Sequence, residues 1–266
     1  MTLNRKSLSA MSSSVSYNFY ATLLDSYQNY LDSDKLWEKF WGSSENPKLT
    51  IDEYAEQSKK DLIDKINRVP FESEAADKGT CFNEVVDCLI ENRNTDKMKV
   101  SKVLNEQGRV TALKVEYKER EFQYPIEMCK DMASYFKGAV TQYYCEAILP
   151  TKYGNVKLYG YLDELMPTCI HDIKTTSRYE AYKFRDHWQH IVYPYCLMEE
   201  GNDITKFEYD VIKWGKDVND YDFFTEVYNY DEAIDKPRLV AHCEGLIEFL
   251  EANRELITDK KIFNLL

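Results

Sequence analysis

Two acidic side chains and a lysine lie in two neighbouring apolar segments near the middle of the chain. Asp163 ends the run Gly160-Tyr161-Leu162-Asp163, and Asp172 and Lys174 follow a short turn in Ile170-His171-Asp172-Ile173-Lys174. Carboxylate oxygens with water are ligands that Mg²⁺ or Mn²⁺ prefers, whereas zinc favours sulfur and nitrogen. A nearby lysine can stabilise negative charge that develops during a reaction. These residues therefore indicate metal-assisted chemistry.

The spacing predicts that the three side chains share one face of a β-hairpin. If the chain turns at Met166-Pro167-Thr168, residues whose numbers sum to about 334 or 335 face each other, so Asp163 lies opposite His171 or Asp172. Asp172 and Lys174 share a face because side chains alternate along a strand, and in the second register Asp163 joins them. Facing carboxylates repel, so a divalent cation is expected between them. The alternative is a surface hairpin with an Asp–Lys pair.

The elements that must position this hairpin are predicted from periodicity and turn residues. Helices are expected over residues 17–40 (capped by Ser16), 51–68 (with a Thr50 capping box), 77–91, 125–136, 178–199 and 231–256. Strands are expected over residues 97–104, 109–117, 121–124, 140–149, 155–165, 168–175, 206–214 and 223–230. This order predicts an α/β or α+β domain over residues 77–266, preceded by a helical N-terminal region over residues 1–76.

Three short motifs in this order resemble one family. Gly-x-x-Asp, Asp-x-Lys on the next strand, and Gln-x-x-x-Tyr on the following helix (Gln189 and Tyr193) resemble the PD-(D/E)xK nuclease superfamily. Within it the chain is most similar to RecB-type exonucleases, which include phage exonucleases and CRISPR-adaptation nucleases. The resemblance covers about residues 79–195 and implies a restriction-endonuclease-like αβββαβ core.

The resemblance also implies roles for individual residues. Asp163 and Asp172 would bind one or two Mg²⁺ or Mn²⁺ ions, and the backbone carbonyl of Ile173 would complete a metal shell. Lys174 would be the catalytic lysine. Gln189 and Tyr193, one turn apart on a helix face, would orient the motif or contact a phosphate; alternatively they only pack beside the sheet. The implied activity is that of a metal-dependent deoxyribonuclease, expected to be an exonuclease in recombination, repair or mobile-element DNA processing.

The first core helix departs from the family pattern. RecB-type enzymes carry a metal-binding histidine in a Gly-x-x-x-His setting, whereas here Gly79 is followed by Asn83 at that position. Asparagine is a neutral and weaker ligand, so either Asn83, Glu84 or Asp87 is expected to complete the metal site, or the site holds fewer metal contacts. The alternative is that all three form only the polar side of an amphipathic helix.

The cysteines do not fit an iron–sulfur cluster. The family members that hold one have three clustered cysteines after the Gln-x-x-x-Tyr helix, whereas this chain has only Cys196 and Cys243 beyond Gln189, so no cluster is expected. Seven scattered cysteines without a Cys-x-x-Cys pair indicate reduced thiols. With no signal peptide and no apolar run of membrane-spanning length, no membrane contact is expected and the location is expected to be cytoplasmic.

The charge distribution bears on the partner. The chain has 266 residues and a net charge of −12, which opposes non-specific binding of a polyanion. Residues 199–235 carry a net charge of −9, whereas residues 97–120 carry +4. DNA is therefore expected to make a narrow contact with the stretch from Lys97 to Arg120, lined by Lys97, Lys99, Lys102 and Lys114.

The sequence also supports predictions for three histidines and two alternative hypotheses about function. His187 and His190 are expected to be solvated or to contact phosphate rather than to bind metal, and His242 to be part of helix packing. A catalytically silent member of the nuclease fold, binding DNA or a protein partner, would account for the missing histidine. An acidic protein that imitates DNA would account only for the net charge.

Overall fold

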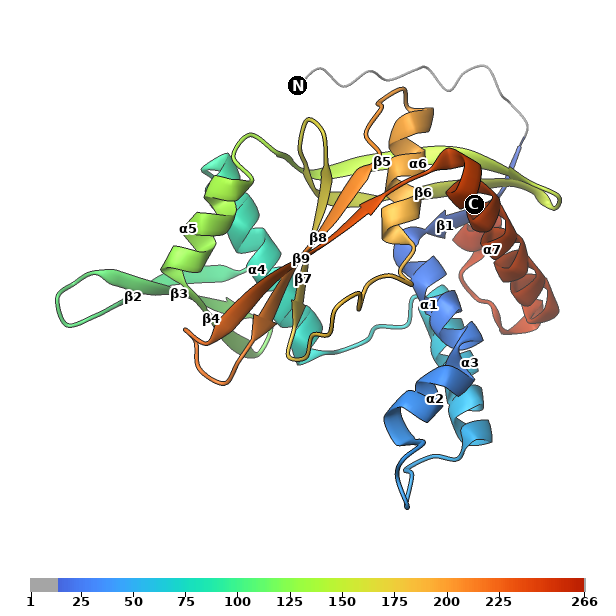
Figure 1. Cartoon of the computed structure of the whole chain (residues 1–266), viewed down its shortest axis with the longest axis horizontal. Coiled ribbons are helices and arrows are strands. Elements are labelled where there is room, and N and C mark those ends of the chain that lie inside the picture. The colour runs from blue at the N-terminus through green and yellow to red at the C-terminus, as the bar shows by residue number, and fades with distance from the viewer. Residues whose placement is uncertain (1–13, 266) are drawn as a thin grey trace.

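The computed structural model describes residues 14–265, which form a mixed α/β structure with seven α-helices and two β-sheets (Figure 1). The helices are α1 (Ala21–Leu31), α2 (Ser33–Trp41), α3 (Ile51–Ile66), α4 (Glu74–Glu91), α5 (Ile126–Tyr135), α6 (Gln189–Glu199) and α7 (Glu232–Ala252). The strands are β1 (Val15–Tyr20), β2 (Lys99–Leu104), β3 (Val110–Tyr117), β4 (Arg120–Pro125), β5 (Val140–Thr151), β6 (Gly154–Leu165), β7 (Ile170–Thr176), β8 (Lys206–Trp214) and β9 (Tyr221–Asn229). Two short 3₁₀ helices, η1 (Arg254–Leu256) and η2 (Lys260–Phe263), follow α7.

The larger sheet has the order β1-β6-β7-β8-β9, with β5 paired to the second edge of β6. β7 and β8 run parallel, and α6 lies in the connection between them. The smaller sheet, β2-β3-β4, is antiparallel and lies with α4 and α5 at one end of the molecule (Figure 1).

Two hydrophobic clusters cover the two faces of the larger sheet. One joins α1, α6 and α7 to the strands through residues such as Leu24, Val192 and Leu246. The other joins α4, α5 and the smaller sheet to Ile173 and Ile212. Because side chains alternate along β7, successive residues around Asp172 point to opposite faces of the sheet, and each face is covered by a different cluster.

Several predicted elements agree with the structure. Thr50 and Glu53 form the expected capping box of α3, and β8 has the predicted bounds. The mixed fold class is confirmed. Within residues 14–265 no helix is both long and apolar enough to cross a membrane.

The predicted helix over residues 17–40 is wrong. Val15–Tyr20 is a strand that pairs in parallel with β6, and it buries Phe19 completely. The helical part that follows is divided into α1 and α2 at Asp32. Aromatic residues suit both states, and the open edge of β6 decides between them.

The predicted helix over residues 178–199 begins only at Gln189. The preceding segment is a series of turns in which Tyr182 has a left-handed φ of 63°. Two of its backbone amides donate hydrogen bonds to carboxylates outside the segment. Phe184 N–H donates to Glu226 and Trp188 N–H donates to Asp25. These distant carboxylates replace helical hydrogen bonds.

Candidate active site

Along one edge, strand β6 pairs with two different strands in succession. The candidate site lies between these two paired segments. β1 pairs with residues 155–159, whereas β7 pairs with Glu164 and Leu165. Among the described residues no strand pairs with the same edge of Gly160–Asp163. Glu164 faces His171, so the hairpin has the second of the two predicted registers and Asp163 is level with Asp172.

The carboxylate of Asp163 joins three elements between these two paired segments. Its Oδ2 accepts the backbone N–H of Ile173 at 3.1 Å, a donor that would otherwise serve strand pairing. The same oxygen accepts Nδ2 of Asn83 from α4, also at 3.1 Å. Asp163, which the sequence predicts to be a metal ligand, therefore links the two hairpin strands to α4.

Asp172, Lys174 and Gln189 form a closed triangle of polar contacts. Nζ of Lys174 lies 2.7 Å from Oδ2 of Asp172 and donates to Oε1 of Gln189 at 2.6 Å. Nε2 of Gln189 donates to Oδ1 of Asp172 at 2.7 Å. Gln189, the first residue of α6, thus fixes the relative position of the acid and the lysine.

Tyr193 lies one turn further along α6 and is buried against Gly160. A Cβ atom at Gly160 would lie 2.6 Å from Cε1 of the tyrosine ring, closer than such atoms approach one another in proteins. The glycine of the Gly-x-x-Asp motif therefore makes room for the tyrosine of the Gln-x-x-x-Tyr motif. Burial, with the negative charge of Asp172, raises the pKa of Tyr193 well above its ordinary value, which keeps its hydroxyl protonated.

A second glycine brings α4 to the site. A Cβ atom at Gly79 would lie 2.8 Å from Oγ1 of Thr175 on β7, so the helix can approach this strand closely only at a glycine. Asn83 follows one turn later and reaches Asp163.

The residues of α4 do not all face Asp163. The carboxylate of Glu84 accepts Nη1 of Arg93 and Nζ of Lys97, both at 2.6 Å, so it is engaged in ion pairs away from Asp163. Asp87 is buried, and its charge acts on Asp163. Of the three α4 residues expected at the metal, Asn83 has a hydrogen bond to Asp163, Asp87 acts on it through its charge, and Glu84 would have to leave two ion pairs to bind a metal.

Carboxylates repel one another across this site. Burial, and then the negative charge of Asp172, raises the pKa of Asp163. Burial and the charge of Glu84 raise the pKa of Asp87 to about 6. For Lys174, burial alone would lower the pKa, but Asp172 and Asp163 offset it and the net shift is upward. The lysine is therefore charged, and a cation bound beside Asp163 and Asp87 would favour their ionised forms.

The donor set fits a hard divalent cation. Asp163, Asp172 and Asp87 offer carboxylate oxygens and Asn83 offers an amide oxygen, which are the ligand types that such a cation prefers. Oδ1 of Asn83 and Oδ1 of Asp87 are buried and have no hydrogen-bond partner among residues 14–265. Buried polar atoms are normally satisfied, so both observations suit a bound Mg²⁺ or Mn²⁺. For Ile173 the contact with this site is its N–H, while its side chain packs in the second cluster.

Gln142 is a residue of the candidate site that no sequence motif indicates. This residue of β5 stands level with Asp163, where the β5–β6 pairing is interrupted, and it has a left-handed φ of 47°. Its side chain acts on Asp87 and offsets part of the rise in the pKa of that carboxyl group. A non-glycine residue in this region carries backbone strain of order 1 kcal/mol, which recurs at functional sites. Such strain has no signature in the local sequence.

The two histidines on α6 and before it do not approach the site oxygens. His190 is buried and stacks on Tyr228 at 4.2 Å, so the expectation that it is solvated is wrong. Nδ1 of His187 lies 3.5 Å from Asp25. His242 donates from Nε2 to the carbonyl of Leu24 and is buried in helix packing, as expected.

The chain matches no protein-family model and no curated protein. Among solved structures, it is similar to the "Crystal structure of SSO0001", with a TM-score of 0.46 and 12% sequence identity, over 91% of this chain and 80% of that chain.

Proposed function

We propose that the protein is a metal-dependent deoxyribonuclease of the PD-(D/E)xK type with a restriction-endonuclease-like core. The observation that carries this proposal is the convergence of Asp163 and the Asp172–Lys174–Gln189 triangle between the two paired segments of β6. These residues come from two strands and a helix, in the order in which the family motifs occur. A surface Asp–Lys pair would need neither a buried glutamine between its members nor a second, partly buried acid level with the first.

The chain's own residues account for much of the chemistry. Asp163 and Asp172, with Asn83 or Asp87, would hold Mg²⁺ or Mn²⁺, which as a Lewis acid supports attack on a phosphodiester when bound. Lys174 donates one proton to Gln189 and forms an ion pair with Asp172, so a further N–H can be donated to a phosphate oxygen. Tyr193 packs behind this triangle against Gly160 and keeps α6 in place.

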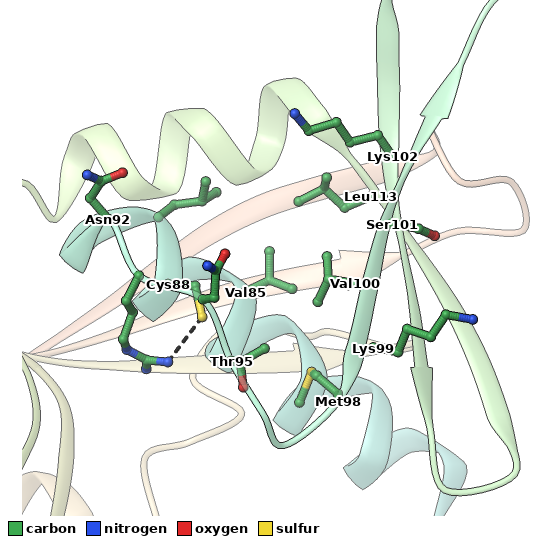
Figure 2. Close-up of a pocket in the computed structure, with 13 residues that line it drawn as sticks. Val85, Cys88, Asn92, Thr95, Met98, Lys99, Val100, Ser101, Lys102 and Leu113 are labelled. Carbon is green, nitrogen blue, oxygen red and sulfur yellow. Dashed lines mark hydrogen bonds between the residues drawn. The ribbon is translucent and has the colours of Figure 1, made fainter.

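We further propose that DNA approaches along the groove between α4 and β2–β3, which has a volume of about 520 Å³ (Figure 2). Lys99 and Lys102 line it, and α4 connects it to Asn83. Lys99 pairs with Glu116 at 2.9 Å and Lys114 pairs with Glu121 at 2.5 Å. Lys102 has no ion pair among residues 14–265, so it is the lysine best able to contact a phosphate.

The test is digestion of linear double-stranded, circular and single-stranded DNA with Mg²⁺ or Mn²⁺. Asp172→Asn and Lys174→Gln keep the shape of the side chains, and each should lower the rate by about 10²–10³-fold. Exonuclease action predicts that linear DNA is degraded and closed circular DNA is not.

A matched control is available in the chain. Lys261 also follows an aspartate by two residues, but it lies in η2, outside the triangle. Lys261→Gln should retain full activity. If wild type and both site variants behave alike on every substrate, the enzymatic proposal is wrong; retained DNA binding would then indicate a catalytically silent binding module.

A further inference from the structure

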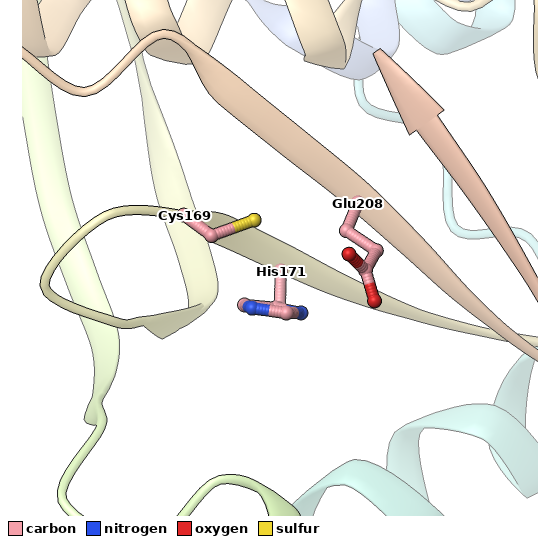
Figure 3. A group of neighbouring side chains, drawn as sticks. All are labelled: Cys169, His171 and Glu208. Carbon is pink, nitrogen blue, oxygen red and sulfur yellow. The ribbon is translucent and has the colours of Figure 1, made fainter. Parts of the chain in front are cut away.

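Three buried residues with metal-binding side chains gather on the face of the large sheet opposite to Asp172. His171 precedes Asp172 on β7 and so points the other way. Glu208 is its neighbour in the parallel register with β8, and Cys169 lies just before β7 (Figure 3). One ligand atom from each residue lies within 4.8 Å of the other two.

We propose that Cys169, His171 and Glu208 bind Zn²⁺ or a divalent transition-metal ion with similar ligand preferences. Sulfur, imidazole nitrogen and carboxylate oxygen together suit Zn²⁺, which lies about 2.0–2.3 Å from such ligands, and do not suit Mg²⁺. Small side-chain rotations would bring the three atoms to one centre. The ligands of this site differ from the oxygen ligands of the candidate active site, and the proposal does not rest on nuclease activity.

The residues around this cluster already orient two of its ligands. Nδ1 of His171 lies 2.9 Å from Oδ2 of Asp210, which is completely buried. This contact fixes the proton on Nδ1 and leaves Nε2 for a metal, the carboxylate–histidine arrangement that accompanies metal-bound imidazoles. The hydroxyl of Tyr135 donates to Oε1 of Glu208 at 2.8 Å and holds that carboxylate.

Unpartnered buried acid beside His171 is a second, independent indication of a cation. Glu164 faces His171 across β6 and β7 and is completely buried. Within residues 14–265 neither of its carboxylate oxygens has a hydrogen-bond partner, and neither does Oδ1 of Asp210. Lys206 contacts only the outer oxygen of Glu208, at 3.2 Å, from a half-exposed position. A buried acidic pocket of this kind is costly without a positive charge at its centre.

Binding requires one proton transfer. The Cys169 thiol now contacts only the carbonyl of Ile170, at 3.4 Å, a weak interaction that a metal bond would replace. The S–H bond breaks as the sulfur–metal bond forms, and the proton leaves to solvent. The bound ion would tie the start of β7 to β8, one residue before Asp172.

The test uses the full chain, stripped of metal with a chelator and titrated with Co²⁺ as a spectroscopic substitute for Zn²⁺. We expect one equivalent of Co²⁺ to produce a thiolate-to-cobalt absorption band, and Zn²⁺ to displace it. Cys169→Ser should abolish the band, whereas Cys243→Ser, which alters an equally buried thiol on α7, should keep it. Asp163→Asn with Asp172→Asn should also keep it, which separates this site from the proposed active site.

A second variant tests the orientation of His171. Asp210→Asn should retain the band but weaken Co²⁺ and Zn²⁺ binding by about 10–100-fold, because the imidazole loses the group that holds it. Circular dichroism of each variant checks that the chain is folded. The proposal is overturned if wild type gives no thiolate band, or if the same band and affinity persist in Cys169→Ser.

Discussion

The ring of Tyr193 occupies the space that a side chain at residue 160 would need, with Cε1 only 2.6 Å from the position of a Cβ atom on Gly160. This contact joins α6 to β6 at the point where β6 passes from its pairing with β1 to its pairing with β7. It explains why a glycine stands three residues before Asp163, and it makes a prediction about stability.

Gly160→Ala should overpack this contact. The added methyl group meets a ring carbon of a buried residue rather than a flexible surface chain, so the free energy of unfolding should fall by about 1–3 kcal/mol. Urea denaturation measures it. The loss should be smaller when Gly160→Ala is made in a Tyr193→Leu background, since the ring is then absent. Equal losses in both backgrounds would show that the two residues are not in contact.

Gln189→Leu should reduce the proposed nuclease activity by about 10–100-fold without unfolding the protein. The leucine keeps the helix start but removes the bonds to Asp172 and Lys174 that hold both side chains. Gln189 is a positioning residue, so the measurements are a pH–rate profile and a Mn²⁺ titration. The affinity for Mn²⁺ should change, and so should the part of the pH–rate profile that reports the ionisation of the lysine. Gln57→Leu alters a glutamine on α3 that bonds to Asp61, and it serves as the control. An unchanged profile would contradict the positioning role.

His242 should make the protein less stable in mild acid. Burial lowers the pKa of this histidine from 6.5 to about 4, so the neutral form is favoured in the folded state. The stabilisation is complete above pH 6.5 and is lost as the pH falls from 6.5 towards 4, because the unfolded chain binds the proton first. The full change is about 3 kcal/mol.

Comparison with His242→Gln isolates this effect. Glutamine can still donate to the carbonyl of Leu24 but has no charge to gain. The difference in unfolding free energy between wild type and variant, measured by denaturation at several pH values, should therefore decrease over this interval. A difference that stays constant from pH 7 to pH 4 would contradict the lowered pKa.

Lys102→Ala should weaken binding of a DNA duplex more than Lys114→Ala. Lys102 faces the groove without an ion pair among the described residues, whereas Lys114 is already paired with Glu121. A lysine that contacts one phosphate contributes about one unit to the slope of log affinity against log salt concentration. Fluorescence anisotropy at several salt concentrations measures both variants. Equal slopes for wild type and Lys102→Ala would exclude this approach for DNA.

How far the sequence predicts the site depends on how local each contact is. The register that makes Asp163 level with Asp172 is one of the two that the sequence predicts, because a short turn at Met166-Pro167-Thr168 restricts the pairing of two adjacent strands. The choice among the α4 residues is not predictable from the sequence. It depends on how the helix docks, through Gly79 against Thr175, and on the capture of Glu84 by Arg93.

Distant partners also explain what was missed in the fold. Val15–Tyr20 has aromatic and β-branched residues that fit a helix pattern as well as a strand, and its pairing with β6 is visible only once the sheet exists. The same applies to Glu208, which comes from another strand and meets Cys169 and His171 only through the β7–β8 register.

The divided edge of β6 has a consequence for how the chain folds. β5 and β6 are joined by a tight turn and pair along most of their length, with an interruption at Gln142, so this hairpin needs little loop closure and is expected to form early. β1 reaches β6 only across a long stretch of chain, and α6 is synthesised after the hairpin it covers. Non-local pairings of this kind slow folding. Asp163 would thus lie on an open strand edge early in folding. Its contacts with Ile173 and Asn83 would be among the last to form.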